Sequence, residues 1–385
     1  MNFFSALKKT KKRRILVVSA GGPQSGIQCI YFCAEGDAWE SVAHAILPYP
    51  DPVEQLVETL ALNPAAAIGL DRLAWLDQRL SYLFLECART ALSHAHKSMR
   101  QPHFVVMNPC TLFRGPAGDG DQARVWDVTL GDAQLLASAL KVPVITGFGR
   151  HGILAGADGG LPLFPGNAKI AKHAEPVSLY LNIGLVAHMA VVDNQAMAIV
   201  LDSDIGPGTC LINLAAREAG CQDGFDRDGS FAAKGKVDSA CLGALMAHEW
   251  FSRPAPKQAF LQELAALYSL PQVAALSPLD RLATLTALTA RSAFEFFKRE
   301  YRQVIPAEVV WLSGGGANNL TLIEYLGTYF DPVKVKSVEE SGIPAALRIP
   351  LALGLSVHEY ISGHRGPWNV RPNPEIRGIG RWVFP

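Results

Sequence analysis

The chain has 385 residues, of which 49% are hydrophobic and 18% are charged, and its 35 basic residues balance its 35 acidic ones. This length exceeds the usual size of one domain, so we expect two domains, each with its own hydrophobic core. A net charge of zero favours neither nucleic acid nor an anionic membrane surface as a partner. No stretch reaches the roughly 18 consecutive apolar residues of a transmembrane helix, so we also expect no membrane span.

The N-terminal segment 8–14 is the chain's only dense run of charge. The apolar stretch after it, 15–20, is too short for a signal peptide. We interpret the run as a solvated tail, with a patch for an anionic partner as the alternative. The seven cysteines show no metal-type pairing, since Cys29 and Cys33 form a Cys-x3-Cys pair without a second pair. Reduced thiols in the cytoplasm are therefore expected.

Apolar runs in the first half predict an α/β domain that opens with a hairpin. Residues 15–18 and 27–33 are short β-branched and aromatic runs on either side of a glycine turn, a pattern typical of two paired strands. The runs 104–107 and 142–145 have the composition of buried parallel strands. The spacing of apolar residues predicts helices at 52–62, 71–97 and 133–140.

A second hairpin, 177–192 with 198–201, opens what we interpret as a second, related half. A short strand at 309–312 leads into a further glycine turn. The segment Ser277-Pro278 is a good helix start signal. Helical spacing in this half is found at 232–251, 257–268 and 278–302.

Three glycine-bearing segments of the second half lie next to predicted strands: Gly184, 204–209 and 313–319. Glycine-rich turns let backbone N–H groups approach a phosphate closely, and glycine accepts the positive φ that other residues resist. Asp204 immediately precedes the second turn, the position of a general base beside a transferred phosphoryl group. Two phosphate turns followed by a nucleotide-base turn predict a phosphotransferase. A capping Asp204 and a plain tight turn at 314–316 are the alternatives.

With their surroundings, these segments resemble the anhydro-N-acetylmuramic acid kinase family. Residues 181–184 are similar to that family's LNIGG, and 204–209 to its DTGPGN. Further similarities follow in order along the chain: 224–237 to D-x-x-G…A-x-x-G-x-V, 282–290 to ATL-x-x-LTA, 314–319 to GGGA-x-N, and 367–369 to P-x-N. Each motif is weak alone, whereas the ordered series from about Arg14 to the end is specific.

The resemblance implies two duplicated α/β domains of the actin/hexokinase (ribonuclease H-like) type around a nucleotide cleft. The recurring hairpin places their boundary near residue 175, so the expected domains are 1–175 and 176–385. The implied activity is an ATP- and Mg²⁺-dependent opening of a 1,6-anhydro sugar ring with phosphorylation of its 6-hydroxyl, in peptidoglycan recycling. The implied protein is a homodimer.

The same resemblance assigns the site residues. Asp204 corresponds to the catalytic base. The nucleotide-binding candidates are Gly21, Gly22, Gly184, Gly206, Pro207, Gly208, Gly314, Gly315, Gly316 and Asn319. No residue is assigned as a metal ligand, and Asp226 and Asp228 either hold Mg²⁺ through water or satisfy a turn.

Most departures from the family lie in the motifs that correspond to its sugar-binding residues. The family's SGTS-x-DG loop reads 20–26 here, where the glycines persist but the hydroxyls are gone and Ser25 replaces an Asp. Its HGQT-x-x-H keeps only Thr111, and its DFRRRD segment keeps one arginine, Arg150. Ser25, Thr111 and Arg150 are therefore the candidate substrate contacts. Arg150 is also open to interpretation as a solvated surface residue.

Other departures lie near the second half's turns. The family's LNIGG and IAN positions read Leu185 and His188, and PKSTGRE survives only as Pro256-Lys257. A family Glu aligns with Arg348, which either faces an anionic substrate or is solvated. The leading hypothesis is a sugar kinase of this family, on the family's substrate or on another small metabolite. The alternative is a catalytically inactive member that acts as a binding or scaffolding partner.

Overall fold

The computed structural model describes residues 3–63, 66–117, 124–156, 159–170, 175–196, 198–301, 307–364 and 378–385. Contacts between residues divide the chain into two compact units, the first made of 1–170 and 349–385 and the second of 171–348. The expected division at residue 175 placed the C-terminal segment in the second domain. The structure places that segment in the first unit, because its last strand pairs with a strand of the first unit's sheet.

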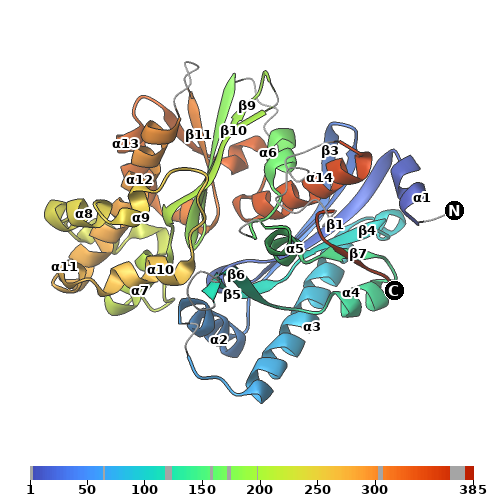
Figure 1. The fold of residues 1–385 in the computed structure, drawn as a ribbon, viewed down its shortest axis with the longest axis horizontal. Helices are drawn as coiled ribbons and strands as arrows, with labels where there is room; N and C mark the ends of the chain where they lie inside the picture. Colours follow the sequence, from blue (N-terminus) through green and yellow to red (C-terminus); the bar gives the residue numbers. More distant parts are fainter. Residues whose placement is uncertain are drawn as a thin grey trace. The chain divides into compact units, whose positions relative to one another are not determined.

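The first unit contains a six-stranded sheet in the order β13-β7-β4-β1-β2-β3 (Figure 1). The predicted hairpin is confirmed, since β1 and β2 pair antiparallel, and so are the predicted parallel strands β4 and β7. The strands are β1 (Lys12–Ala20), β2 (Ile27–Glu35), β3 (Ala38–Leu47), β4 (Phe104–Asn108), β7 (Val144–Thr146) and β13 (Arg381–Val383). A separate pair, β5 (Cys110–Ala117) with β6 (Arg124–Leu130), was not predicted.

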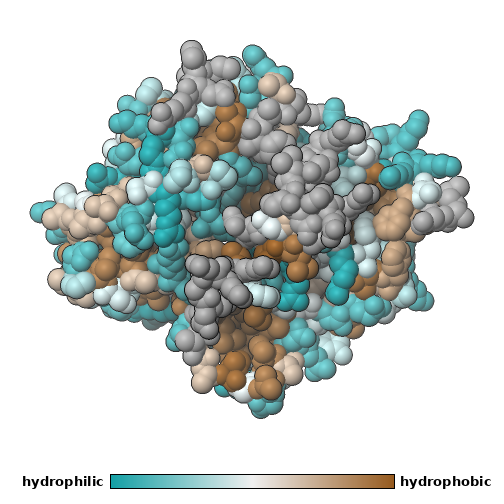
Figure 2. Space-filling view, viewed as in Figure 1, coloured by the Kyte–Doolittle hydropathy of each residue, from teal (hydrophilic) through white to brown (hydrophobic). Residues whose placement is uncertain are grey.

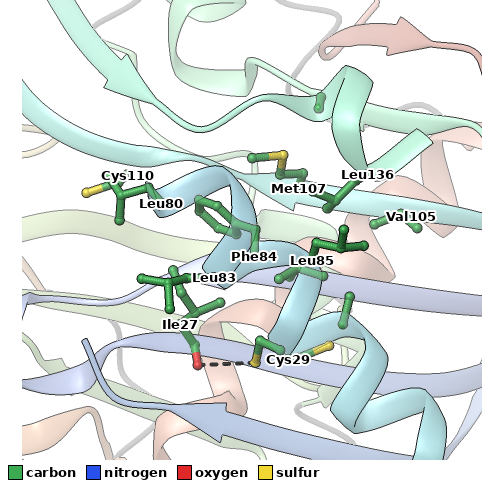
Figure 3. Packing of buried hydrophobic residues seen from close by; sticks show 14 of the residues in the cluster. Ile27, Cys29, Leu80, Leu83, Phe84, Leu85, Val105, Met107, Cys110 and Leu136 are labelled. Atoms are coloured by element: carbon green, nitrogen blue, oxygen red, sulfur yellow. Dashed lines mark hydrogen bonds between the residues drawn. The ribbon is translucent and has the colours of Figure 1, made fainter. Parts of the chain in front are cut away.

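The helices of this unit include the three that apolar spacing predicts, at 52–62, 71–97 and 133–140. They are α1 (Phe3–Lys9), α2 (Asp51–Leu62), α3 (Leu70–His94), α4 (Ala133–Leu140), α5 (Phe148–Leu154), α6 (Phe164–Ile170) and α14 (Arg348–Ser362). Buried residues of α3 recur every three or four positions, at Leu76, Leu80, Leu83, Cys87 and Ala91, and pack on one sheet face. Figure 3 shows Leu80, Leu83 and Phe84 between Met107 of β4 and Ile27 of β2.

The other face of the sheet is covered by α14, which approaches it closely at Gly354. A Cβ atom at Gly354 would lie 2.5 Å from Val17 Cγ2 and 2.8 Å from the Phe32 ring, so only glycine fits there. Buried polar contacts fix the same helix, because Lys169 Nζ of α6 lies 2.9 Å from Glu359 Oε1. The C-terminal segment is therefore part of the first unit's core.

The second unit repeats the arrangement of the first in a five-stranded sheet, β10-β9-β8-β11-β12. Its three strands β8 to β10 pair antiparallel, and β11 and β12 continue the sheet in parallel with β8. The strands are β8 (Val177–Ile183), β9 (Val186–Asp193), β10 (Ala198–Pro207), β11 (Val309–Ser313) and β12 (Lys334–Ser337). An antiparallel β-meander followed by two parallel strands, found in both units, is the ribonuclease H-like order, so the predicted fold class is confirmed.

Helices of the second unit cover its sheet, and α12 is the longest. They are α7 (Cys210–Glu218), α8 (Ser239–Met246), α9 (Glu249–Ser252), α10 (Leu261–Ala265), α11 (Pro271–Ala274), α12 (Pro278–Glu300) and α13 (Leu320–Phe330). The start of α12 is confirmed, since the hydroxyl of Ser277 accepts the Asp280 N–H. The single helix predicted at 232–251 is wrong, because Asp238 and His248 each cap a new short helix within it.

The surface mixes hydrophilic and hydrophobic residues on the face drawn in Figure 2. Hydrophobic residues gather where α2 and α3 of the first unit reach the surface, and Leu70 there is 83% exposed. Within the part of the chain that the structure describes, no helix combines the length and apolarity needed to cross a membrane.

Candidate active site

Two of the three glycine segments follow neighbouring parallel strands of the second unit. Strands β8 and β11 pair in register, with Ser313 opposite Asn182, and the Ser313 hydroxyl donates to Asn182 Oδ1 at 3.1 Å. The chain turns immediately afterwards, at Gly184 and Gly314. Ligands of open α/β sheets bind outside the carboxyl ends of such strands. The structure therefore brings these two segments to the edge of the sheet where a ligand is expected.

The third segment packs directly against the Gly184 turn. The Gly208 N–H donates to the Leu185 carbonyl at 2.9 Å, and the Thr209 N–H donates to the Gly184 carbonyl at 2.8 Å. A Cβ atom at Gly208 would lie 2.1 Å from the Gly184 oxygen. Because no side chain fits between the two turns, glycine at position 208 is required for them to meet.

The glycines of the 314–316 turn differ in what surrounds them. Gly314 has φ +82°, and a Cβ there would lie 2.6 Å from the Ile183 carbonyl oxygen. A Cβ at Gly316 would lie 2.3 Å from Ile183 Cγ2. At Gly315, no atom of the described residues lies within 4 Å of that position. Gly314 and Gly316 are thus needed for packing, whereas Gly315 leaves its backbone open to an incoming group.

Three other predicted nucleotide contacts are engaged in packing or capping. The Asn319 side chain is buried and its Oδ1 accepts the Leu322 N–H at 2.9 Å, which caps α13. Gly206 has φ +153° in a β-bulge, and a Cβ there would lie 3.0 Å from Ser292 Oγ. Pro207 is buried at the end of β10.

Asp204 lies on β10, the edge strand of this sheet, and the segment 257–259 covers that edge. The Asp204 N–H donates to the Lys257 carbonyl at 3.1 Å, and Asp204 Oδ2 accepts the Ala259 N–H at 2.9 Å. A carboxylate has about four lone-pair sites, so one backbone N–H fixes its orientation without exhausting its capacity to accept a proton. A carboxylate fixed in this way can act as a general base.

Lys257 anchors the segment that holds Asp204. Its Nζ donates to the Trp250 carbonyl at 3.1 Å and lies 3.9 Å from the centre of the Trp250 ring. Burial and the nearby Arg299 lower the pKa of Lys257 to about 8, although Asp204 acts in the opposite direction. In the sequence, the remnant Pro256-Lys257 of the family's PKSTGRE was the signal for this contact.

Charged side chains lie beside Asp204. His188 pairs with Asp204 across β9 and β10, and its Nε2 lies 3.0 Å from Asp202 Oδ1. Arg348 is 1% exposed and its guanidinium lies 4.4 Å from the centre of the Tyr180 ring, so its interpretation as a solvated residue is wrong. Burial lowers the pKa of Arg348 to about 10, against the opposing effects of Tyr180 and Asp202.

The carboxylate of Asp226 has a structural function. Its two oxygens accept the N–H groups of Phe231 and Ala232, both at 2.9 Å. Two interpretations were left open for Asp226, a water-mediated Mg²⁺ contact and a carboxylate that accepts the backbone N–H groups of a turn. The structure supports the second. Among the described residues, no group of three or more His, Cys, Asp or Glu could hold a metal ion.

The remaining candidates belong to the first unit. The glycine loop between β1 and β2 closes on itself, since the Gly21 N–H donates to Gly26 O and the Ser25 N–H donates to Gly22 O, both at 2.8 Å. Thr111 lies half-buried on β5. Arg150 is 62% exposed, and its Nε lies 3.2 Å from Asp127 Oδ1. Residues 367–369, which resemble the family's P-x-N, lie outside the described residues.

The sheet is ribonuclease H-like, and three glycine turns meet at its strand ends beside the carboxylate of Asp204. This combination defines the class of proteins that includes actin-like ATPases and sugar kinases. The sequence profile described as anhydro-N-acetylmuramic acid kinase matches residues 13–368. The chain belongs to this family.

Individual relatives agree with this membership. The anhydro-N-acetylmuramic acid kinase of Vibrio vulnificus strain CMCP6 is 26% identical over 376 residues, which cover 96% of both proteins. That of Xanthomonas campestris pv. campestris strain 8004 is 30% identical over 298 residues, or 75% of each. Among solved structures, component A of the Acidaminococcus fermentans (R)-2-hydroxyglutaryl-CoA dehydratase covers 91% of this chain and 99% of its own, with 11% identity and a TM-score of 0.45.

Proposed function

We propose that the protein is an ATP-dependent sugar kinase that resembles anhydro-N-acetylmuramic acid kinase. The observation that carries the proposal is the convergence of the Gly184, Gly208 and Gly314 turns beside Asp204, in a chain that belongs to that family. We further propose, from the family resemblance, a divergent cytoplasmic enzyme of amino sugar metabolism and peptidoglycan turnover that forms a homodimer.

The chain's own groups suit such a reaction. Backbone N–H groups at the turns, with Gly315 the most open, bind phosphate oxygens. Asp204, fixed by the Ala259 N–H, takes the proton of the attacking hydroxyl or water. Bound ATP with Mg²⁺ supplies the phosphoryl group and neutralises its oxygens. Mg²⁺ keeps several waters and needs only one or two carboxylates besides phosphate, which fits a site without a cluster of protein ligands among the described residues.

The sugar contacts are proposed to come from Ser25, Thr111 and Arg150. Arg150 already pairs with Asp127, so its guanidinium has a fixed carboxylate neighbour in the absence of substrate. Because the Asp of the family's first loop is replaced by Ser25, we expect turnover of anhydro-N-acetylmuramic acid to be lower than that of a typical family member. Efficient turnover of that sugar would contradict this assignment of the sugar side.

Asp204→Asn tests the function directly. An amide oxygen still accepts the Ala259 N–H but takes no proton, so we expect an unchanged melting temperature, nucleotide binding no weaker than that of the wild type, and a loss of turnover of roughly 10²–10⁴-fold. Calorimetry with an ATP analogue and Mg²⁺, and ATP-consumption assays over a panel of sugars, provide the measurements. The wild type is expected to bind the analogue.

The outcomes separate the hypotheses. Near-wild-type turnover in Asp204→Asn would make Asp204 structural. No binding of the analogue at millimolar concentration would refute the kinase proposal. Binding without turnover of any sugar would point instead to a catalytically inactive family member.

A further inference from the structure

The β8–β10 part of the second unit's sheet has one apolar face and one polar face. Leu181, Met189 and Val191 are fully buried on the apolar face, where α12 packs against β9 and β10. Side chains of residues paired directly across antiparallel strands point to the same face. The register pairs Asn182 with His188 and His188 with Asp204, so these polar residues share the opposite face.

Asp202 joins them on that face, because it lies two residues before Asp204 on β10 without an intervening bulge. Two ionised carboxylates so placed are about 6–7 Å apart along the strand and repel each other. They also repel an anionic ligand. The imidazole of His188 lies between them in the register and contacts Asp202 at 3.0 Å.

The surroundings of His188 favour the protonated, positively charged imidazole. Burial lowers the pKa of His188, but the charge of Asp202, its hydrogen bond and the charge of Asp204 together raise that pKa above the ordinary value, while Arg348 opposes them. Among the described residues, Asp202, Asp204 and Arg348 are the charged groups that act on the imidazole. Its Nδ1 is buried and has no hydrogen-bond partner among the described residues.

We propose that the imidazolium of His188 offsets the charge of Asp202 and so lowers the negative charge on the sheet face that carries Asp204, beside the turns proposed to bind the nucleotide's phosphates. The proposal rests on the proposed function for its ligand, an adenine nucleotide. The pair is a feature of this chain, because the family's IAN motif has an asparagine at the position of His188.

The proposal predicts a pH dependence of a definite sign. A pKa that is raised in the folded protein means that the imidazolium and its pair with Asp202 are complete at low pH and are lost as pH rises through that pKa. Above it, Asp202 loses the positive charge of His188, although Arg348 still acts on it. Nucleotide affinity is therefore expected to fall as pH rises through the titration of His188.

The first experiment measures the pair without nucleotide. NMR titration of the imidazole resonances of the full-length protein, with His188 assigned by its absence in His188→Asn, gives its pKa in the wild type and in Asp202→Asn. We expect the pKa of His188 to lie above that of an ordinary histidine and to fall clearly in Asp202→Asn, where burial and Arg348 are left to dominate. An unchanged titration in Asp202→Asn would overturn the proposal.

The second experiment measures affinity for an ATP analogue with Mg²⁺ by calorimetry. His188→Asn removes the positive charge that contacts Asp202 and is expected to bind about tenfold more weakly. The double variant His188→Asn/Asp202→Asn is expected to recover most of that loss and to lose the pH dependence. A purely structural role for His188 predicts no recovery, and that result would overturn the proposal. If the wild type binds no nucleotide, the proposed function fails, while the NMR titration still decides whether the pair exists.

Discussion

Glycine serves two purposes in the second unit's turns. At Gly208 it lets two loops touch, because a side chain there would collide with the Gly184 carbonyl. At Gly315 it leaves open space in front of the backbone. One position is therefore required by the fold, whereas the other is available to a ligand.

Alanine substitutions separate these two purposes. Gly208→Ala is expected to destabilise the second unit by about 2 kcal/mol or more, since backbone must move to admit the Cβ. Gly315→Ala is expected to keep the wild-type melting temperature but to weaken nucleotide binding, because the new methyl group occupies the open space. Thermal unfolding and calorimetry measure both variants. Equal melting temperatures for the two would refute the packing argument.

The lowered pKa of Lys257 makes the free energy of unfolding depend on pH in the alkaline range. Its pKa is 10.5 in an ordinary setting and about 8 in the folded protein, so between these values the unfolded chain binds more protons. Stability contributed by this group therefore rises with pH across that window. Urea unfolding at pH 7.5 and 9.5 is expected to show a larger alkaline gain for the wild type than for Lys257→Met. The same change in both proteins would show that Lys257 keeps an ordinary pKa.

At the scale of elements, local signals were enough for the hairpins, the parallel strands and α12. They failed at 232–251, where Asp238 and His248 interrupt a run of good helix formers by capping new helices. The glycine turns beside Asp204 were predictable from order and composition. The contact of Ala259 with Asp204 was not, because it joins residues 55 apart and uses a backbone N–H that any residue supplies.

The start of α12 offers a test of local sequence signals. Ser277→Ala removes the acceptor of the Asp280 N–H and is expected to destabilise the second unit by about 1 kcal/mol. Ser252→Ala is the matched control, since the Ser252 hydroxyl is exposed and donates only to the Glu249 carbonyl of its own short helix. Its effect is expected to stay within about 0.5 kcal/mol. Chemical denaturation followed by circular dichroism distinguishes the two variants, and equal losses would contradict the capping role.

At the scale of the molecule, the two ends of the chain meet in the first unit. Trp382 of β13 packs edge-on against Phe3 and Phe104, with ring centres 5.5 and 5.7 Å apart. The sequence did not predict this return, because β13 is only three residues long and follows a segment without strand signals.

Trp382→Ala tests whether that return stabilises only the first unit. It is expected to destabilise this unit by about 2 kcal/mol through lost apolar burial and aromatic contacts. Hydrogen exchange of backbone amides reports each unit separately. Faster exchange is expected in β1, β4 and β7 and unchanged exchange in β8 to β11. Uniform acceleration would show that the two units unfold as one.

The return of the C-terminal segment has a consequence for biosynthesis. The second unit, 171–348, is one continuous stretch, so its sheet is complete in sequence before the ribosome has translated α14. The first unit begins emerging earlier but lacks the helix that covers one face of its sheet, α14, and the strand at its edge, β13, until residues 348–383 have been translated. The unit whose first strands are made first is therefore the unit that completes its fold last, and the nascent chain carries a sheet with one uncovered apolar face until α14 and β13 have been translated.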